Sequence, residues 1–209
     1  YSESFLPRSG EQFKSLSASS AALDPDVYES TEVGVKVALN DGLSITAAYF
    51  DSEQTVATRD SVTGETNEIV GLQVDGLELE VKGKVTEQMS VVFGYTSIDG
   101  KTSSGGEPRE IPDTMLSLFA TYEVSDKFGW ALGMTKQGES NIGNNKPGLV
   151  LPEYTRVDLA AYYQIADDLS VQMNVENLTD ELYFPHSHST HQASIGEPFN
   201  MRISIRKTF

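Results

Sequence analysis

The chain contains stretches of alternating apolar and polar residues, and the connections between these stretches follow a pattern. Along the whole chain, short turns and long loops alternate. Short turns fall at 40–42, 86–88, 125–127 and 167–168, and long polar loops run roughly over 6–28, 58–72, 97–113, 137–153 and 182–198. An outer-membrane barrel has this asymmetry, because its periplasmic turns are short and its outer loops are long. A soluble β-sandwich has no reason to keep every short connection at one end. The pattern therefore predicts an all-β fold, a transmembrane antiparallel β-barrel.

Composition limits the other possibilities. The 209 residues are enough for one β domain. Fifteen Lys and Arg against 31 Asp and Glu give a net charge of −16, which argues against nucleic acid as a partner, because phosphate binding needs a basic surface. Without cysteine, no disulfide framework is expected. No apolar run approaches the roughly 18 residues that a membrane helix requires, but a closed barrel also satisfies its backbone hydrogen bonds within a membrane.

The alternating segments have the period of β-strands with two different faces. Between Leu43 and Tyr49 the odd positions are apolar, whereas the even positions are small or polar. The same alternation recurs at 33–39, 77–85, 89–95, 157–163, 169–175 and 199–209, and with the even positions apolar at 116–122 and 130–134. With an edge fragment at 1–5, about ten strands are predicted.

Aromatic residues on the apolar face favour a membrane over a soluble sandwich. They lie at strand ends, beside the long loops in one group (Tyr49, Tyr95 and Phe199) and beside the short turns or the chain end in the other (Tyr122, Phe128, Tyr163 and Phe209). Two such girdles around a band of aliphatic residues are expected where rings settle at the two membrane interfaces. Lys207 is the exception on this face, and its ammonium is expected to reach the interface.

Charged residues occupy the opposite face and predict a wide, water-filled interior. They include Glu78, Glu80, Lys82, Lys84, Arg156, Asp158, Glu176, Arg202 and Arg206. Many inward charges and long loops suit the large class of barrel, in which about 22 strands surround a plugged lumen. The segment 1–5 has no preceding hairpin partner, so the chain is expected to be the C-terminal part of a longer barrel.

Five motifs in order along the chain carry a family resemblance. They are YSESFLP at 1–7, YESTEVGVK at 28–36, VDGLELE at 74–80, LPEYTRVD at 151–158 and NVENLTDELY at 174–183, followed by a closing strand that ends in Phe209. Together they resemble the C-terminal half of a TonB-dependent outer-membrane siderophore receptor of the catecholate or hydroxamate type. Two departures from the family pattern bear on which ligand is bound. Where the family commonly has G-x-P-R before the last strand, this chain has GEPF at 196–199. The strand that begins with IPD at 111–113 would more usually begin with a basic residue or His.

The resemblance implies a bacterial outer-membrane receptor that imports ferric siderophores and is energised through TonB. Residues 1–209 would be the C-terminal barrel portion, with the N-terminal plug, the TonB box and the first strands outside this chain. Implied partners are the ferric siderophore as transported ligand, TonB, outer-membrane lipid and the barrel-assembly machinery, for which Phe209 would be the signal. No resident cofactor is implied. Alternatives are a receptor for vitamin B12, haem, copper or an oligosaccharide, and a passive porin-like barrel or a barrel enzyme.

Ligand contacts are expected in the long loops. His186, His188 and His191 form an H-x-H-x-x-H cluster whose imidazoles suit transition metals. The alternatives are a plain polar loop that tolerates His, a contact with the transported ligand, and a metal site; the last is disfavoured because a siderophore already encloses its iron, so the receptor has to recognise the complex and not to ligate the metal. Arg109 is the basic loop candidate for pairing with an anionic complex, beside Arg8, Arg59 and Lys146. No catalytic signature is present, since the acidic pair at 167–168 is turn chemistry, and the chain is not expected to be an enzyme.

Overall fold

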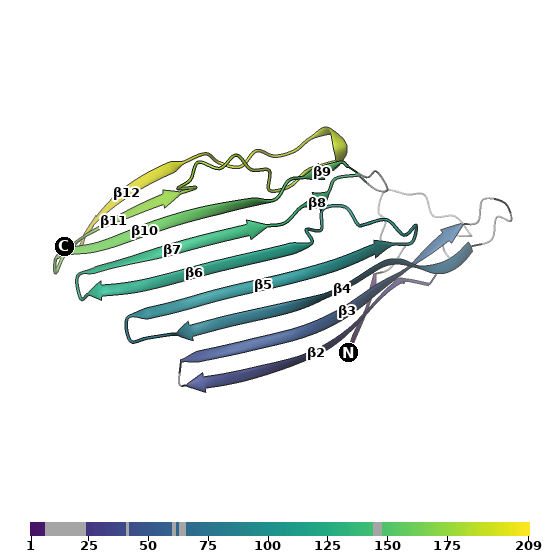
Figure 1. Ribbon diagram of the computed structural model, residues 1–209, viewed down its shortest axis with the longest axis horizontal. Helices are drawn as coiled ribbons and strands as arrows, with labels where there is room; N and C mark the ends of the chain where they lie inside the picture. Colours follow the sequence, from purple (N-terminus) through teal and green to yellow (C-terminus); the bar gives the residue numbers. More distant parts are fainter. Residues whose placement is uncertain (7–23, 41, 60–61, 63–65, 144–147) are drawn as a thin grey trace.

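The computed structural model describes residues 1–6, 24–40, 42–59, 62, 66–143 and 148–209. Ten strands form one antiparallel sheet in the order β1-β2-β3-β4-β5-β6-β7-β10-β11-β12 (Figure 1). Their bounds are β1 Ser2–Leu6, β2 Asp26–Asn40, β3 Leu43–Arg59, β4 Thr66–Lys84, β5 Met89–Thr102, β6 Thr114–Ser125, β7 Phe128–Gln137, β10 Tyr154–Ala166, β11 Leu169–Glu176 and β12 Asn200–Lys207. A small ribbon pairs β8 Ser140–Asn141 with β9 Val150–Leu151, and η2 Ser189–His191 is a 3-10 turn. The prediction of about ten antiparallel strands is confirmed.

The four short turns lie at one end of the sheet, as the sequence predicts (Figure 1). They connect β2 to β3, β4 to β5, β6 to β7 and β10 to β11. Side chains close two of them: Thr86 Oγ1 accepts from the backbone N–H of Met89 at 3.0 Å, and Ser125 Oγ accepts from that of Phe128 at 3.2 Å. Hydroxyl groups of this kind fix tight turns locally. Asp41, in the first turn, lies outside the described residues.

The predicted loop at 58–72 is wrong, because most of it is strand. β3 and β4 stay paired as far as Arg59 opposite Thr66, and β5 likewise runs on to Thr102, into the loop predicted at 97–113. These extensions carry no regular apolar alternation, since Ile69 and Val70 on β4 are adjacent and most of the other residues are polar, so backbone pairing alone identifies them as strand. The predicted loop at 6–28 lies largely outside the described residues.

The strand registers place the apolar positions on one face of the sheet. One cross-strand row runs from β2 to β10 through residues paired in turn, namely Val37, Ile45, Val81, Phe93, Leu118, Met134 and Val157. Side chains on this face remain open to the surroundings: Val33 on β2 and Ile205 on β12 are each 73% exposed. A sandwich core would bury these side chains, whereas a lipid-facing wall leaves them outermost. The predicted parity is therefore confirmed.

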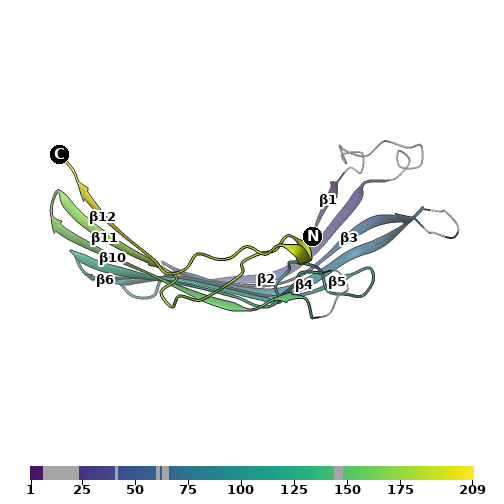
Figure 2. The same cartoon turned by 90° about the horizontal axis from the view of Figure 1, so that it is seen from above.

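The opposite face is polar but not uniformly so. Glu78 and Glu80 lie on it, in register with Thr96 and Thr46, yet Val92 and Phe119 share that face and are also exposed. The sheet is curved and open, with β1 and β12 at its two raised ends (Figure 2). Completion of the barrel by further strands, and the total of about 22, remain predictions.

Candidate functional site

At the end away from the short turns, the β5–β6 connection is fastened to the β7–β10 connection. The backbone N–H of Glu110 donates to the carbonyl of Asn141 at 2.8 Å, and Pro112 forms an antiparallel bridge with Ser140. The backbone N–H of Asp113 also donates to the carbonyl of Glu139 at 3.3 Å. The two loops therefore form one surface, in which the ribbon of β8 and β9 takes part.

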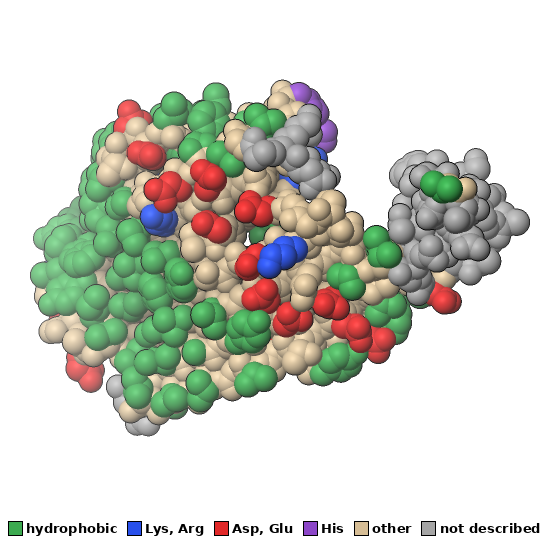
Figure 3. All heavy atoms as spheres, turned by 45° about the vertical axis from the view of Figure 1, so that its right-hand side comes forward, with side chains coloured by type: hydrophobic (Ala, Val, Ile, Leu, Met, Phe, Trp, Pro, Cys, Tyr) green, Lys and Arg blue, Asp and Glu red, His purple; other side chains and the backbone are tan. Residues whose placement is uncertain are grey.

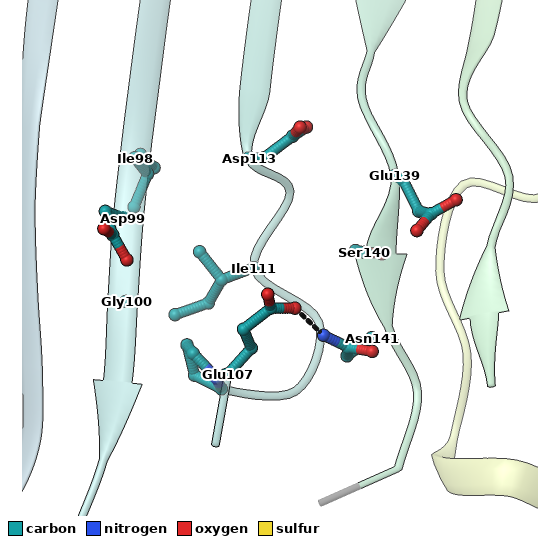
Figure 4. A pocket seen from close by; sticks show the side chains of 10 residues that line it. Ile98, Asp99, Gly100, Glu107, Ile111, Asp113, Glu139, Ser140 and Asn141 are labelled. Carbon is teal, nitrogen blue, oxygen red and sulfur yellow. Dashed lines mark hydrogen bonds between the residues drawn. The ribbon is translucent and has the colours of Figure 1, made fainter. Parts of the chain in front are cut away.

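A cavity of about 440 Å³ opens between these two loops. Among the residues that the structure describes, its lining is acidic and contains no Lys, Arg or His: Ile98, Asp99, Gly100, Glu107, Pro108, Ile111, Asp113, Glu139, Ser140 and Asn141. Glu107 and Asn141 point toward each other and are hydrogen-bonded (Figure 4). The carboxylates give this cavity a negative field, which favours a ligand with a cationic or neutral group at this point.

A row of aspartates crosses β3, β4 and β5 near the loop end of the sheet. The row lies on the same face as the apolar residues. Asp51 lies opposite Asp75, and Asp75 lies opposite Asp99. Like charges directly opposite each other are unfavourable, but here Tyr49 donates to Asp75 at 3.2 Å and Lys101 lies 3.7 Å from Asp99. On the face seen in Figure 3, hydrophobic side chains gather on the left and acidic ones toward the loop end. The loop end is thus anionic directly beyond the apolar band.

The acidic surface continues to the edge strand. Tyr1 donates a hydrogen bond of 2.6 Å to the carboxylate of Glu29, and this bond raises the pKa of Tyr1 to about 12. Glu29 in turn lies opposite Glu3 on β1 and Glu53 on β3. Much of the net charge read from the sequence is therefore concentrated at the loop end of β1 to β5.

Arg109 lies in the β5–β6 connection, beside the cavity but not among its lining residues. Its side chain is 41% exposed, and Nε is 3.3 Å from a carboxylate oxygen of Glu110. Arg109 also forms a parallel bridge with Asn141, so its backbone is held. Its guanidinium is therefore accessible, although partly neutralised by its neighbour. Of the other basic candidates, Arg59 ends β3, and Arg8 and Lys146 lie outside the described residues.

The three histidines lie together in the β11–β12 connection but do not form one cluster. His186 Nε2 is 2.9 Å from Ser194 Oγ, whereas His188 Nδ1 is 3.2 Å from His191 Nε2. Their spacing in the sequence did not indicate which two would meet. No contact links any of them to Arg109 in the described parts of the chain, so the structure does not bring these candidates into a single site.

Asn177 anchors the β11–β12 connection, a role that the sequence motif did not reveal. It is 1% exposed and has φ of 50°, in the left-handed region that Asn tolerates better than most residues. Its Nδ2 donates to the carbonyls of Glu181 at 2.9 Å and Glu197 at 3.0 Å, and its Oδ1 accepts from the backbone N–H of Glu181 at 2.9 Å. Its own backbone N–H donates to Asp158 at 2.8 Å. One amide side chain thus ties the start of this loop to its end.

Tyr183 holds the same loop against β10. Its ring is 4.7 Å from that of Tyr154, and its hydroxyl accepts from Arg156 Nη1 at 3.1 Å. A Cβ at Gly196 would lie 2.2 Å from the Tyr183 ring, so only glycine leaves room for it. Arg156 is fixed in turn by Asp158 at 2.8 Å. The loop therefore packs on the concave side of the sheet near the barrel wall (Figure 2).

Residues 1–178 match the family model described as TonB dependent receptor-like, beta-barrel. The metal-pseudopaline receptor CntO of Pseudomonas aeruginosa is 30% identical over 98% of this chain and 30% of its own length. The ferripyoverdine receptor of the same organism is 30% identical over 100% of this chain and 28% of its own length. The chain thus spans under a third of the length of the curated relatives that it matches.

Solved structures share the fold. The ferripyoverdine receptor of the outer membrane of P. aeruginosa, bound to ferripyoverdine, superposes with a TM-score of 0.80 at 28% identity, over 98% of this chain and 30% of that one. The ferric-catecholate import receptor Fiu of E. coli K12 gives a TM-score of 0.84 at 23% identity, over 99% of this chain and 32% of that one. The curved ten-stranded sheet therefore corresponds to a section of a receptor barrel wall.

Proposed function

Since the chain belongs to the TonB-dependent receptor β-barrel family, we propose that it forms part of an outer-membrane receptor that takes up ferric siderophores with energy supplied through TonB. The match of residues 1–178 to the family model carries this proposal. The apolar face of the sheet is exposed, and the long connections lie at one end of it. Both features agree with a barrel wall in lipid. The family consists of transport receptors, which disfavours the porin-like barrel and the barrel enzyme.

Ferric siderophores are the ligand class favoured by the relatives. Curated relatives that cover nine tenths or more of this chain include receptors for ferripyoverdine and ferrioxamine. In our proposal the siderophore is cargo, no cofactor resides in the barrel, and recognition lies at the loop end with the acidic cavity, Arg109 and the histidine loop. An acidic cavity suits a siderophore that carries a cationic group better than one that is anionic throughout.

A second candidate ligand is the complex of another transition metal. The relative named metal-pseudopaline receptor is 30% identical over 98% of this chain, as high an identity as that of the ferripyoverdine receptor. The imidazoles of the histidine loop are ligands that suit several such metals. Vitamin B12, haem and oligosaccharide have no comparable support among the described residues.

The loop end, not the turn end, is expected to determine binding in the complete receptor. Replacing Arg109, His186, His188 and His191 together by Ala should weaken binding of ferripyoverdine or ferrioxamine B, used as probes, by about tenfold, or ~1.4 kcal/mol. The matched control replaces Asp167 and Asp168 by Ala at the opposite end and should leave affinity unchanged. Titration calorimetry measures both. Loss of binding in the turn variant, with retention in the loop variant, would reverse the proposed orientation.

Outer-membrane lipid and the barrel-assembly machinery are the other proposed partners. Deletion of Phe209 tests the role of the assembly machinery. Phe209 follows β12 and is fully exposed, with Lys207 Nζ 5.7 Å from its ring centroid and 3.6 Å from Asp168. Deleting Phe209 in the complete receptor should lower the yield of membrane-inserted protein severalfold, whereas Phe209→Tyr, which keeps a ring there, should not. The measurement is the folded fraction in isolated outer membranes. Equal yields for the deletion and the wild type would count against an assembly role.

A further inference from the structure

The β11–β12 connection ends in a small hairpin that presents its histidines on a fixed backbone. The backbone N–H of Ser194 donates to the carbonyl of His186 at 3.0 Å, and that of His188 donates to the carbonyl of Gln192 at 2.7 Å. Between them, η2 makes the tip of the hairpin. Two cross-hairpin bonds and a 3-10 turn therefore set the relative positions of the histidine side chains.

Two of the three imidazoles meet at this tip. His188 Nδ1 and His191 Nε2 are 3.2 Å apart, and the rings stand edge to face, with centroids 5.1 Å apart and an interplanar angle of 84°. Both residues are exposed, so the pair is accessible from outside. His186 is excluded from the pair, because its Nε2 lies beside Ser194 Oγ. Without a metal, one ring of the pair donates a hydrogen bond to the other.

The distance between the two ring nitrogens fits a shared metal ion. Two imidazole nitrogens bound to one tetrahedral Zn²⁺ at about 2.0–2.1 Å stand roughly 3.3 Å apart. Imidazole also suits Cu²⁺ and Ni²⁺. We infer that His188 and His191 form a two-imidazole chelate for a divalent transition-metal ion of this group, held at the loop end of the barrel. The ion replaces the proton that the two rings otherwise share.

The rest of the coordination sphere is open. Among the described residues, no group of three or more His, Asp or Glu is placed to hold a metal, so the pair has no third protein ligand there. Water or donor atoms of an incoming molecule fill the remaining positions, as in sites that exchange a ligand and unlike closed structural sites. This site binds the metal ion itself, independently of whether the receptor transports ferric siderophores.

Metal titration of the complete receptor tests the inference. Untagged receptor, purified in detergent and stripped with a chelator, is titrated with Zn²⁺ alone, with no siderophore present. One ion per receptor is expected to depend on the pair. His188→Ala and His191→Ala should each weaken its binding at least about tenfold, the lower end of the effect of removing a residue that only supports a metal ligand. His186→Ala is the matched control from the same hairpin and should bind as the wild type does.

Each result decides the matter. Loss of the ion in the two pair variants, with retention in His186→Ala, establishes the chelate. Absence of Zn²⁺ binding by the wild type, or unchanged binding by the His188→Ala, His191→Ala double variant, overturns it. Equal loss in His186→Ala overturns the two-residue arrangement. X-ray absorption of the Zn²⁺-loaded receptor should show two imidazole ligands in the wild type and one in either pair variant. Siderophore binding in parallel keeps this result separate from the proposed function.

Discussion

Leu118→Arg is expected to destabilise the assembled barrel by about 2–4 kcal/mol, the cost of a lipid-facing Arg near the membrane midplane. Leu118 lies opposite Phe93 and Met134 on the apolar face, between the girdle at Tyr95 and the girdle at Tyr122. No protein element among the described residues covers that face, so a guanidinium there would be left in hydrocarbon. The measurement is the free energy of unfolding of the complete receptor in bilayers.

Ser117→Arg is the matched control, one residue away on the other face. Ser117 lies opposite Gly94 and Thr135 on the concave side, and it shares a shallow hollow with Glu78 and Glu80. An Arg there meets water and carboxylates, so it should cost much less than Leu118→Arg. A lipid-phase label attached at position 118, but not at 117, should contact the acyl chains. Equal costs for the two variants, or no lipid contact at 118, would contradict a membrane wall.

Most of the fold follows from the sequence because its dominant signal has a period of two. A shift of one residue in the pairing of any strand would move every apolar side chain to the wrong face, so the parity of Val37, Ile45, Val81 and Leu118 excludes every odd shift of register. The observed pairs follow that parity across the sheet. The short turns were equally predictable, because residues that favour turns mark them, and in two of them the hydroxyl groups of Thr86 and Ser125 close the turn locally.

The strand extensions were missed because they lack a regular alternation of apolar and polar residues. From Ser52 to Arg59 most residues are polar, and from Thr66 to Leu72 the apolar residues Ile69, Val70 and Leu72 do not alternate regularly, so a period of two cannot be read there. Pairing between β3 and β4 satisfies the backbone groups just as it does within the membrane. Acidity on these extensions was visible in the composition, but only the register shows that Asp51, Asp75 and Asp99 form one row.

The candidate site was predictable in outline and not in detail. The spacing of the histidines placed them in one loop, but the 3-10 turn at 189–191 determines that His188 meets His191 while His186 turns to Ser194. Similarly, the motif at 174–183 marked the family without indicating what Asn177 does. An Asn just after an alternating segment was the only local sequence signal of such an anchor, and it is too common to identify one.

Asn177→Ala is expected to release the β11–β12 connection from the barrel wall, at a cost of about 2–4 kcal/mol. The substitution removes three side-chain hydrogen bonds from a residue that is almost fully buried. It leaves the backbone N–H of Glu181 and two carbonyls without these partners, and because these bonds are only partly buried, each is expected to contribute the roughly 0.5–1.5 kcal/mol of an ordinary hydrogen bond. An Ala with φ of 50° adds strain, because the left-handed region costs most residues roughly 1–2 kcal/mol.

Hydrogen–deuterium exchange over 177–199, together with the thermal stability of the complete receptor, measures this effect. Asn177→Gly separates the two causes, since it relieves the backbone strain but restores no hydrogen bond, and it should therefore recover only about 1 kcal/mol. Leu178→Ala, at the exposed neighbouring position, should stay within about 0.5 kcal/mol of the wild type. Because the anchor joins Glu181 at the start of the loop to Glu197 near its end, exchange should rise throughout the loop. Unchanged protection in Asn177→Ala would mean that Tyr183 and its contacts alone hold the loop in place.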